Sequence, residues 1–346
     1  DVFRLAEEEG VIEPGSSSRI SVFFSPGGKG YYSATLTVRS NDPDQGLFSI
    51  PVGGEIIDPA RLVTITTIAG NGEEGYSGDG GPATSASLAS PNGVSSDYAG
   101  NIYIADTENG RIRKVDGQTG TITTAANLRS PEKVFVDDSG DIYVAGSGPI
   151  YRIDGRTGSV EMVAGGGSSH GDGSIAAAVH LKEAADVHVD ASGNLFIAEW
   201  AGHQIRKVDG QTGIITTVAG NGENGFSGDG GPAIDAVLSH PQGIFVDGFG
   251  NLYIADTNNN RVRKVDGQTG IITTVAGNSG ESFNGDGVPA IEATLTGPED
   301  IFLAGTGVFY VSDFAGNQIL EVERIGDLYI ADTFNHRLRK VDGQMG

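Results

Sequence analysis

The chain has 346 residues, which is long enough for one large domain and one small domain. It contains no cysteine, and this excludes disulfides, thiol catalysis and zinc sites built from cysteine. Acidic residues outnumber basic residues by 45 to 22, and the formal net charge of −23 disfavours nucleic acid as a partner. The sequence has no apolar run of about 18 residues, so no membrane span is predicted.

Residues 1–58 are predicted to form short β-strands without an internal repeat. The β-rich runs stand at 2–5, 19–24, 31–39 and 47–53. Motifs such as Phe24-Ser-Pro26 and Pro51-Val-Gly-Gly54 resemble the end of an immunoglobulin-like module of the ASPM/SPD-2/Hydin type or of bacterial choice-of-anchor surface proteins. A complete sandwich of this kind needs about 100 residues. The segment is therefore predicted to be a partial immunoglobulin-like β-sandwich with open strand edges.

From residue 59 onward the sequence repeats, and the repeat predicts the fold. A Gly-Asn/Asp-Ile/Leu-Tyr-Ile-Ala-Asp core followed by Arg-x-Arg-Lys-Val-Asp-Gly occurs at 100–117, 250–267 and 326–343. Weaker copies of the core stand at 141–146, 194–199 and 308–313. Each full copy holds four short β-rich runs separated by turns. The pattern predicts an all-β domain over residues 59–346, a β-propeller of about six four-stranded blades.

These repeats resemble the bacterial form of the NHL repeat, which carries a long Gly-Ser-Gly-Asp-Gly-Gly-Pro-Ala loop. The matching segments are 69–72, 75–83, 91–93, 103–106 and 111–115, and the same string returns between 219 and 265. The resemblance is specific for the propeller fold. It implies less about function, because NHL propellers serve as binding platforms, as sensors and occasionally as enzymes.

The two ends of the repeat region are predicted to close the ring together. Residues 64–69 match an outermost strand whose inner strands are missing, and the chain ends where the outermost strand after 337–341 would begin. We therefore expect 64–69 to pair with 337–341. The outermost strand, long loop and innermost strand expected between 323 and 327 are absent, so the last blade is predicted to be incomplete.

Loops that follow the second and fourth strands of a blade are expected on one face. Four of these loops are long, 70–90, 165–182, 220–240 and 277–297, and each carries an aspartate between glycines: Asp79, Asp172, Asp229 and Asp286. One interpretation is a calcium site, because carboxylates and free carbonyl groups suit a hard cation. The other is a structural turn held by the aspartate side chain. Calcium at these four residues is the only cofactor that the sequence suggests.

Two further columns of the repeat have structural interpretations. The aspartates that end the core, such as Asp106 and Asp256, recur shortly before Arg111 and Arg261 and are expected to form a local ion pair or a loop cap. Asn109, Gly202 and Asn259 share one position between them, and we expect a left-handed backbone there.

Departures from the repeat indicate the candidate binding residues. Trp200 and His203 replace the usual polar residues of the loop after the second strand, and Phe314 and Phe334 fall at the column of Trp200. Exposed aromatic side chains at this column would anchor a protein or a glycan. In the alternative interpretation they cover the base of a neighbouring long loop.

The histidines do not form a catalytic arrangement in the sequence. No three share a repeat column that would gather them around the axis. His188 alone stands on an innermost strand, where a propeller would let it face the channel. We therefore expect a non-enzymatic interaction module, extracellular or at the cell surface, whose long-loop face binds a protein or glycan. The alternatives are a structural subunit that self-associates through open β edges, and a metal-dependent lyase or hydrolase.

Overall fold

The computed structural model describes the side chains of residues 67–169, 171–279 and 289–301, and outside these ranges it describes the strands named below. The chain forms two compact units, Asp1–Thr64 with Gln344–Gly346, and Ile65–Gly343. Each unit is treated by itself. The described elements are β-strands and short 3₁₀ turns, which confirms the all-β prediction.

In the first unit the structure describes two strand pairs. β1 (Phe3–Leu5) pairs antiparallel with β2 (Val22–Phe24), and β3 (Gly30–Arg39) pairs antiparallel with β4 (Leu47–Ile56). These strands lie where the β-rich runs predicted them. The assignment of residues 1–58 to an immunoglobulin-like module, and the boundary at residue 58, stay predictions.

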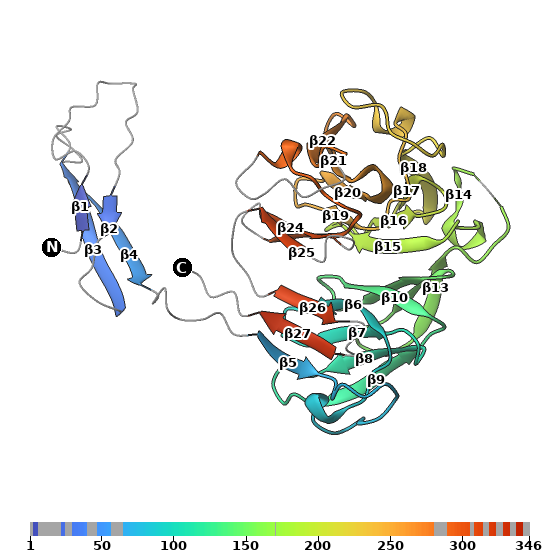
Figure 1. The fold of residues 1–346 in the computed structure, drawn as a ribbon, viewed down its shortest axis with the longest axis horizontal. Helices are drawn as coiled ribbons and strands as arrows, with labels where there is room; N and C mark the ends of the chain where they lie inside the picture. Colours follow the sequence, from blue (N-terminus) through green and yellow to red (C-terminus); the bar gives the residue numbers. More distant parts are fainter. Residues whose placement is uncertain are drawn as a thin grey trace. The chain divides into compact units, whose positions relative to one another are not determined.

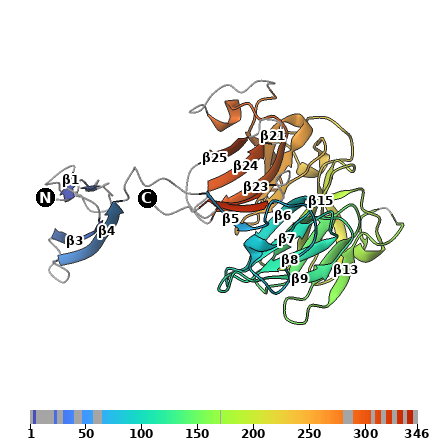
Figure 2. The same ribbon diagram turned by 60° about the horizontal axis from the view of Figure 1, so that its bottom comes forward.

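The second unit is a succession of antiparallel sheets, arranged around a common centre in Figures 1 and 2. Sheet one is β6 (Pro91–Ser96), β7 (Ile102–Asp106), β8 (Arg111–Val115) and β9 (Ile122–Asn127). Sheet two is β10 (Pro131–Val136), β11 (Ile142–Gly146), β12 (Ile150–Ile153) and β13 (Val160–Ala164), and one bridge between Gly146 and Ala184 joins it to the next sheet. Sheet three is β15 (Ala184–Val189), β16 (Leu195–Glu199), β17 (Gln204–Val208) and β18 (Ile214–Ala219), with β14 (Ser174–Ile175) added beside β18. Sheet four is β19 (Ile244–Val246), β20 (Leu252–Asp256), β21 (Arg261–Val265) and β22 (Ile272–Ala276).

Two further sheets have three strands each. Sheet five is β23 (Pro298–Ala304), β24 (Val308–Asp313) and β25 (Gln318–Val322). The closing sheet is β26 (Leu328–Asp332), β27 (Arg337–Val341) and β5 (Ile65–Ala69), with Val341 opposite Ile65 and Leu338 opposite Ala69. The predicted pairing of 64–69 with 337–341 is therefore confirmed. β26 contacts β6 of sheet one, so the two ends of the succession meet.

The core lies between neighbouring sheets. The second strand of sheet one, β7, is buried along its whole length, as expected for a strand covered on both faces. Between sheets three and four, Phe196 and Ile205 pack with Leu238 and Ile254 in one apolar cluster. Burial of this kind provides roughly 25 cal/mol per Å² of apolar surface and is the main source of stability for the ring.

The long loops turn out to be part of this core. In the first loop Ala83, Ala86 and Leu88 are fully buried, and the 3₁₀ turn η1 (Ala83–Ser85) lies beside the outer strand of sheet one, where Ala83 N–H donates to Gly120 O at 2.9 Å. The long loop before sheet three, residues 165–182, has η2 (Ala176–Ala178), and we call it the third loop. The long loop before sheet four has η3 (Ala233–Asp235), and η5 (Ala290–Glu292) precedes sheet five. A long loop is thus a wedge between two sheets that covers an outer strand edge, rather than a free binding loop.

Candidate functional site

Three fully or almost fully buried arginines join the long loops to the sheets. Arg113 on β8 lies between two carboxylates, with Nη1 3.3 Å from Asp106 Oδ2 and Nη2 2.7 Å from Asp79 Oδ1. Arg263 on β21 lies between Asp256 at 3.3 Å and Asp229 at 2.7 Å. Arg206 on β17 lies between Glu199 at 3.4 Å and Asp172 at 2.9 Å. We call each set of one arginine and two carboxylates a clamp.

The inner carboxylate of a clamp also caps a loop. Asp106 has no exposed surface, and its Oδ1 accepts the backbone N–H of Ala89 at 2.7 Å. Asp256 accepts the N–H of Ser239 in the same way. Burial raises the pKa of Asp106 and of Asp256 above the ordinary value, against the opposing effect of their hydrogen bonds. Ion pair and loop cap are therefore both present, but the ionic partner is the second arginine of the third strand and not Arg111 or Arg261.

The outer carboxylates belong to the aspartates at which the sequence suggests either a calcium site or a structural turn. Asp79 and Asp172 each accept a hydrogen bond from the backbone of an outer strand, Thr124 N–H at 3.2 Å and Thr217 N–H at 2.9 Å, in addition to the clamp arginine. Asp229 accepts the hydroxyl of Thr274 at 2.7 Å. Among the residues that the structure describes, no group of three or more His, Cys, Asp or Glu is arranged to hold a metal ion. Asp286 lies outside the described residues, and calcium at these positions stays a prediction.

The left-handed turn position lies one residue later than the sequence predicted. Positive φ angles occur at Gly110, His203 and Asn260, with values of 62°, 54° and 54°, and not at Asn109, Gly202 or Asn259. The asparagine recurs for another reason, since Asn109 Nδ2 donates to Asp106 at 2.8 Å and to Gly75 O at 2.7 Å. His203 therefore occupies a position where an ordinary side chain is strained, and histidine is among the residues enriched there.

Trp200 and His203 lie together with a third side chain at the junction of sheets three and four. The Trp200 ring stands 4.4 Å from the ring of His240, which lies 4.4 Å from the ring of His203. The backbone N–H of His240 donates to His203 Nδ1 at 3.2 Å, and Asn258 Nδ2 lies 2.8 Å from His240 Nδ1. All three rings are half-buried. We call this group the ring cluster; His240, at the end of a long loop, was missed because the sequence shows no repeat column of histidines.

The ring cluster lies where two kinds of loop meet. Trp200 N–H donates to Glu183 O at 2.9 Å, and Asn258 N–H donates to Ser239 O at 3.2 Å, so loops after second strands contact the ends of long loops. This agrees with the expectation that both loop types share one face. It also agrees with the alternative that Trp200 covers the base of a long loop. Phe314 and Phe334 lie outside the described residues.

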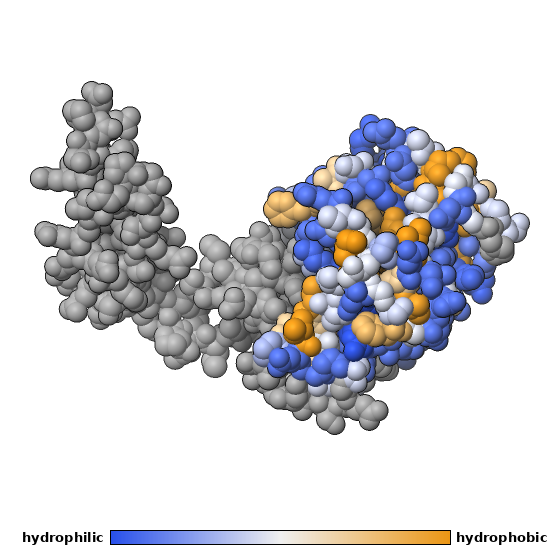
Figure 3. Space-filling view, turned by 90° about the horizontal axis from the view of Figure 1, so that it is seen from above, coloured by the Kyte–Doolittle hydropathy of each residue, from blue (hydrophilic) through white to orange (hydrophobic). Residues whose placement is uncertain are grey.

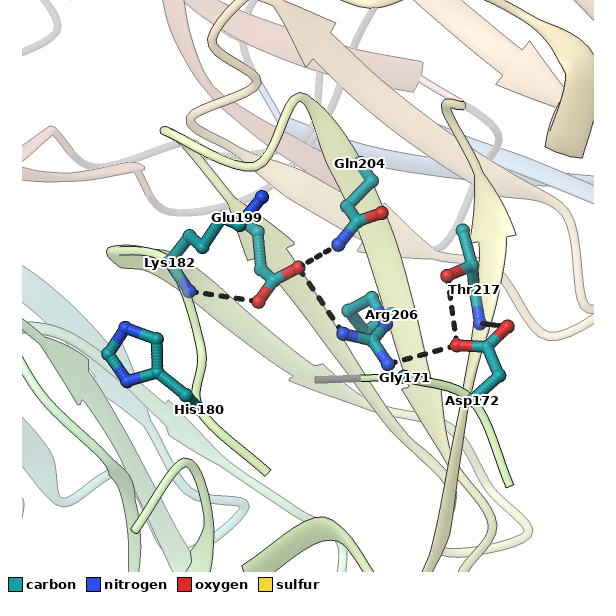
Figure 4. A pocket seen from close by; sticks show the side chains of 8 residues that line it. All are labelled: Gly171, Asp172, His180, Lys182, Glu199, Gln204, Arg206 and Thr217. Carbon is teal, nitrogen blue, oxygen red and sulfur yellow. Dashed lines mark hydrogen bonds and ion pairs between the residues drawn. The ribbon is translucent and has the colours of Figure 1, made fainter. Parts of the chain in front are cut away.

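A cavity of about 250 Å³ lies beside the clamp of sheet three. Its lining is Gly171, Asp172, His180, Lys182, Glu199, Gln204, Arg206 and Thr217. Figure 4 shows Arg206 between Asp172 and Glu199, with Lys182 and His180 on the far side of Glu199. Glu199 also accepts the backbone N–H of Lys182 at 2.9 Å and the side chain of Gln204. Every polar lining residue belongs to the third loop or to sheet three.

A second polar group lies on the innermost strands. Lys133 Nζ of β10 is 2.6 Å from Asp300 Oδ2 of β23, an ion pair between sheets two and five. Asp186 of β15 stands at the same register and is almost fully buried, and burial followed by the charge of Asp300 raises its pKa to about 7. Its Oδ2 accepts the N–H of Ile244 at 2.8 Å. Sequence reasoning missed these three residues because they share one repeat column in which the most regular copies have glycine, Gly93 and Gly243.

His188 lies two residues further along β15, inside an aromatic layer. Its ring centre is 4.3 Å from that of Phe135 and 4.7 Å from that of Phe245. It is 7% exposed, and among the described residues its Nδ1 has no hydrogen-bond partner. Burial lowers the pKa of His188 to about 4. The imidazole is therefore neutral at pH 7.

Replacing His188 by phenylalanine, the residue of this column on β10 and β19, is expected to stabilise the protein. Removing the unpaired Nδ1 should add about 1 kcal/mol to the free energy of unfolding at pH 7. The folded pKa lies below the unfolded value, so wild-type stability is lost as pH falls from about 6.5 towards 4, and the advantage of His188→Phe should grow there by roughly 3 kcal/mol. Urea unfolding across this pH range measures it. The exposed His180→Gln variant is the control, and parallel stability curves for His188→Phe and the wild type would contradict the prediction.

The comparisons with known proteins support an NHL-repeat β-propeller. The family model described as the teneurin NHL domain matches residues 66–130 and 219–284. These ranges hold sheets one and four with their long loops. The third loop and sheet three, which carry the cavity and Trp200, lie outside both ranges.

Curated relatives match over part of their length. "Protein SUPPRESSOR OF QUENCHING 1, chloroplastic" of Arabidopsis thaliana is 30% identical over 199 residues, covering 57% of this chain and 16% of the relative. "NHL repeat-containing protein 2" of Homo sapiens is 28% identical over 154 residues, covering 43% of this chain and 19% of the relative. "Teneurin-1" of Mus musculus is 30% identical over 244 residues, covering 57% and 9%. The chain thus spans less than a fifth of each of these relatives, and they do not point to one compartment.

A solved structure supports the fold. An auxiliary nutrient binding protein from Bacteroides ovatus aligns with a TM-score of 0.51 and 20% identity, covering 74% of this chain and 59% of that chain. At this identity the likeness shows the fold alone, and it does not decide whether the chain is an enzyme. No helix in the described part of the chain is long and apolar enough to span a membrane.

Proposed function

We propose that the propeller is a non-catalytic protein-binding module whose contact surface is centred on the ring cluster. The observation that carries the proposal is that two departures from the repeat, Trp200 and His203, pack with His240 into one half-buried group. Sheets one and four have threonine and a glycine or asparagine at these positions, Thr107 with Gly110 and Thr257 with Asn260. The ring closure and the clamps do not need the aromatic groups, since those sheets form without them.

The physical argument concerns preorganised aromatic surface. Tryptophan is enriched at the energetic centres of protein interfaces because it buries a large area and loses little conformational freedom. Contact with His240 already restricts the Trp200 ring, so a partner would pay little entropy to order it. The face seen in Figure 3 is mostly hydrophilic, with apolar residues in separate patches. A face of this kind offers separate apolar anchors rather than a broad apolar interface.

Other elements of the function rest on the sequence. We propose Phe314, at the column of Trp200, and Phe334, one residue later in its own repeat, as further contact residues for a protein or glycan. We propose an extracellular or cell-surface location because residues 1–58 resemble anchor-type modules. We propose that module and its boundary at residue 58 on the same basis.

The proposal is tested with variants that the chain itself supplies. Trp200→Thr with His203→Asn gives the third loop the residues of Thr257 and Asn260, and asparagine keeps the left-handed conformation at position 203. Proteins captured from the native source by the full chain are quantified against this double variant. We expect partners held by the wild type to fall at least about tenfold, because an interface anchor contributes about 2 kcal/mol or more.

The control is a change of similar size at the opposite end of a sheet. Phe249→Thr removes an 87% exposed aromatic from the turn between β19 and β20, and capture should be unchanged. Unfolding curves for both variants should match the wild type. Equal capture by the wild type and Trp200→Thr/His203→Asn would refute the ring cluster as the contact surface.

A further inference from the structure

Two of the three described clamps are covered by an aromatic ring from the preceding long loop. The ring of Tyr76 has the guanidinium carbon of Arg111 3.9 Å from its centre and that of Arg113 4.9 Å away. Phe226 covers Arg261 and Arg263 in the same way, at 3.9 and 4.7 Å. Such stacking of a guanidinium on an aromatic face is attractive. We call each of these rings a plug.

The Tyr76 plug also makes polar contacts. Its hydroxyl donates to Asp79 Oδ2 at 2.9 Å and lies 3.2 Å from Thr124 Oγ1. The ring is therefore seated on four side chains: those of Asp79, Arg111, Arg113 and Thr124.

Among the residues that the structure describes, no ring of the third loop covers its clamp, and this loop is shorter than the first. Gly70 and Gly165 are equivalent, since their N–H groups donate to Ala83 O and Ala176 O at the start of the corresponding 3₁₀ turns. Counting from these glycines to the clamp aspartate gives 79 − 70 = 9 residues in the first loop and 172 − 165 = 7 in the third. Residues 165–171 contain glycine, serine and histidine but no Phe, Tyr or Trp. The shorter loop therefore has no Phe, Tyr or Trp to take the place of Tyr76.

The cavity of sheet three is the place that the missing ring would occupy. The four residues that seat Tyr76 correspond to Asp172, Gln204, Arg206 and Thr217, and all four line the cavity. Its volume of about 250 Å³ exceeds the roughly 150 Å³ of an engineered apolar cavity that binds benzene. We call this cavity the socket.

The groups in the socket have the chemistry that Tyr76 meets elsewhere. Arg206 is 4% exposed, its two Nη atoms bind Asp172 and Glu199, and no aromatic ring of the described residues covers its face. Asp172 has the position of Asp79, whose carboxylate accepts a hydrogen bond from the Tyr76 hydroxyl, so it can accept one from a phenol in the same way. The third loop further differs in His180 and Lys182, exposed side chains where the first loop has Ser87 and Ala89.

We propose that the socket binds a tyrosine side chain of a protein partner, which completes the clamp of sheet three as Tyr76 completes that of sheet one. The proposal rests on the proposed function for the existence of a protein partner. It names the residue that the partner presents. The socket itself is a property of this chain and is testable without the partner.

The first test uses p-cresol and N-acetyl-tyrosine amide as probes with the full chain. We expect one site, with amide shifts confined to the third loop and sheet three and a dissociation constant on the order of 1 mM, because so small a ligand makes few contacts. Cyclohexanol, which has the hydroxyl but no aromatic face, should bind several-fold more weakly. A matched variant replaces residues 166–170 by the sequence of residues 71–77 and adds Gln204→Arg, which installs a tyrosine plug. This variant should no longer bind p-cresol.

A second test creates the socket elsewhere. Tyr76→Ala opens the equivalent space on sheet one, and because Tyr76 is 45% exposed the fold should survive. The number of p-cresol sites should rise from one to two. Absence of p-cresol binding to the wild type, or equal binding by the plugged variant, would overturn the socket. Capture that is lost in Trp200→Thr/His203→Asn but kept in the plugged variant would overturn the tyrosine inference and leave the proposed function standing.

Discussion

Replacing Arg263 by methionine is expected to lower the free energy of unfolding by about 3–5 kcal/mol. Arg263 and Asp256 are both 0% exposed, and Arg263 also holds Asp229 of the long loop through two nitrogens at 2.7 and 3.0 Å. Removing the guanidinium leaves the Asp256 charge buried without its ionic partner. It also releases the loop from β21. Urea unfolding at pH 7 measures the loss, and Lys264→Met, the neighbouring half-buried cation, is the control with an expected loss below about 1 kcal/mol.

The pH dependence distinguishes this mechanism from lost packing. Burial already raises the pKa of Asp256, and without Arg263 that pKa should rise further. A raised carboxyl pKa contributes stability that is present below the unfolded value and is lost as pH rises through the folded value. Arg263→Met should therefore approach the wild type as pH falls towards 4, and adding Asp256→Asn should recover part of the loss at pH 7. A deficit that is the same at both pH values would contradict the electrostatic account.

Much of the strand architecture followed from the repeat. Four β-rich runs separated by glycine turns define a sheet with little ambiguity, because the alternation of side chains and the turn residues agree. The pairing of residues 64–69 with 337–341 was predictable for the same reason, since each segment lacked the neighbour that the other supplied.

The clamps were predictable in principle from a constant spacing. Asp79 precedes Arg113, Asp172 precedes Arg206 and Asp229 precedes Arg263 by the same 34 residues. The nearer Arg111 obscures this spacing, because its proximity in sequence to Asp106 suggests the wrong partner. The spacing breaks at Asp286, where 286 + 34 = 320 is a leucine. A contact is therefore identified from the repeats only when the positions of both contacting residues are compared in every copy.

The socket shows what a repeat alignment leaves out. The shorter third loop and the missing aromatic are visible in the sequence, but their consequence depends on where the Tyr76 ring lies. The contacts of Tyr76 with Arg113 and Asp79 show where that ring lies, and the cavity of sheet three lies at the equivalent place. The predicted position of the left-handed backbone was wrong for a related reason. Asn109 recurs because its side chain forms hydrogen bonds, and the left-handed conformation belongs to the next residue.

Removing β5 is the second change with a large expected effect. Two truncated chains, one starting at Val63 and one at Gly70, differ mainly by Ile65–Ala69. The shorter chain loses the antiparallel partner of β27 and the fully buried Ala69, which packs with Leu88 and Ile104 between sheets. We expect its melting temperature to fall by at least about 10 °C, since an open ring loses both a strand ladder and part of a core cluster. The chain from Val63 should melt close to the full chain.

The same truncation tests whether the ring depends on both ends of the chain. Without β5 the outer edge of β27 is exposed, and an exposed edge pairs with other chains. The chain from Gly70 should therefore associate in sedimentation experiments at concentrations where the chain from Val63 does not. Ala69→Asp in the full chain gives an independent measure, because it buries a charge in the same cluster while the strand remains present. If both truncated chains melt together and remain alike in sedimentation, β5 does not close the ring, and the stability of the closing sheet must come from β26 and its contact with β6.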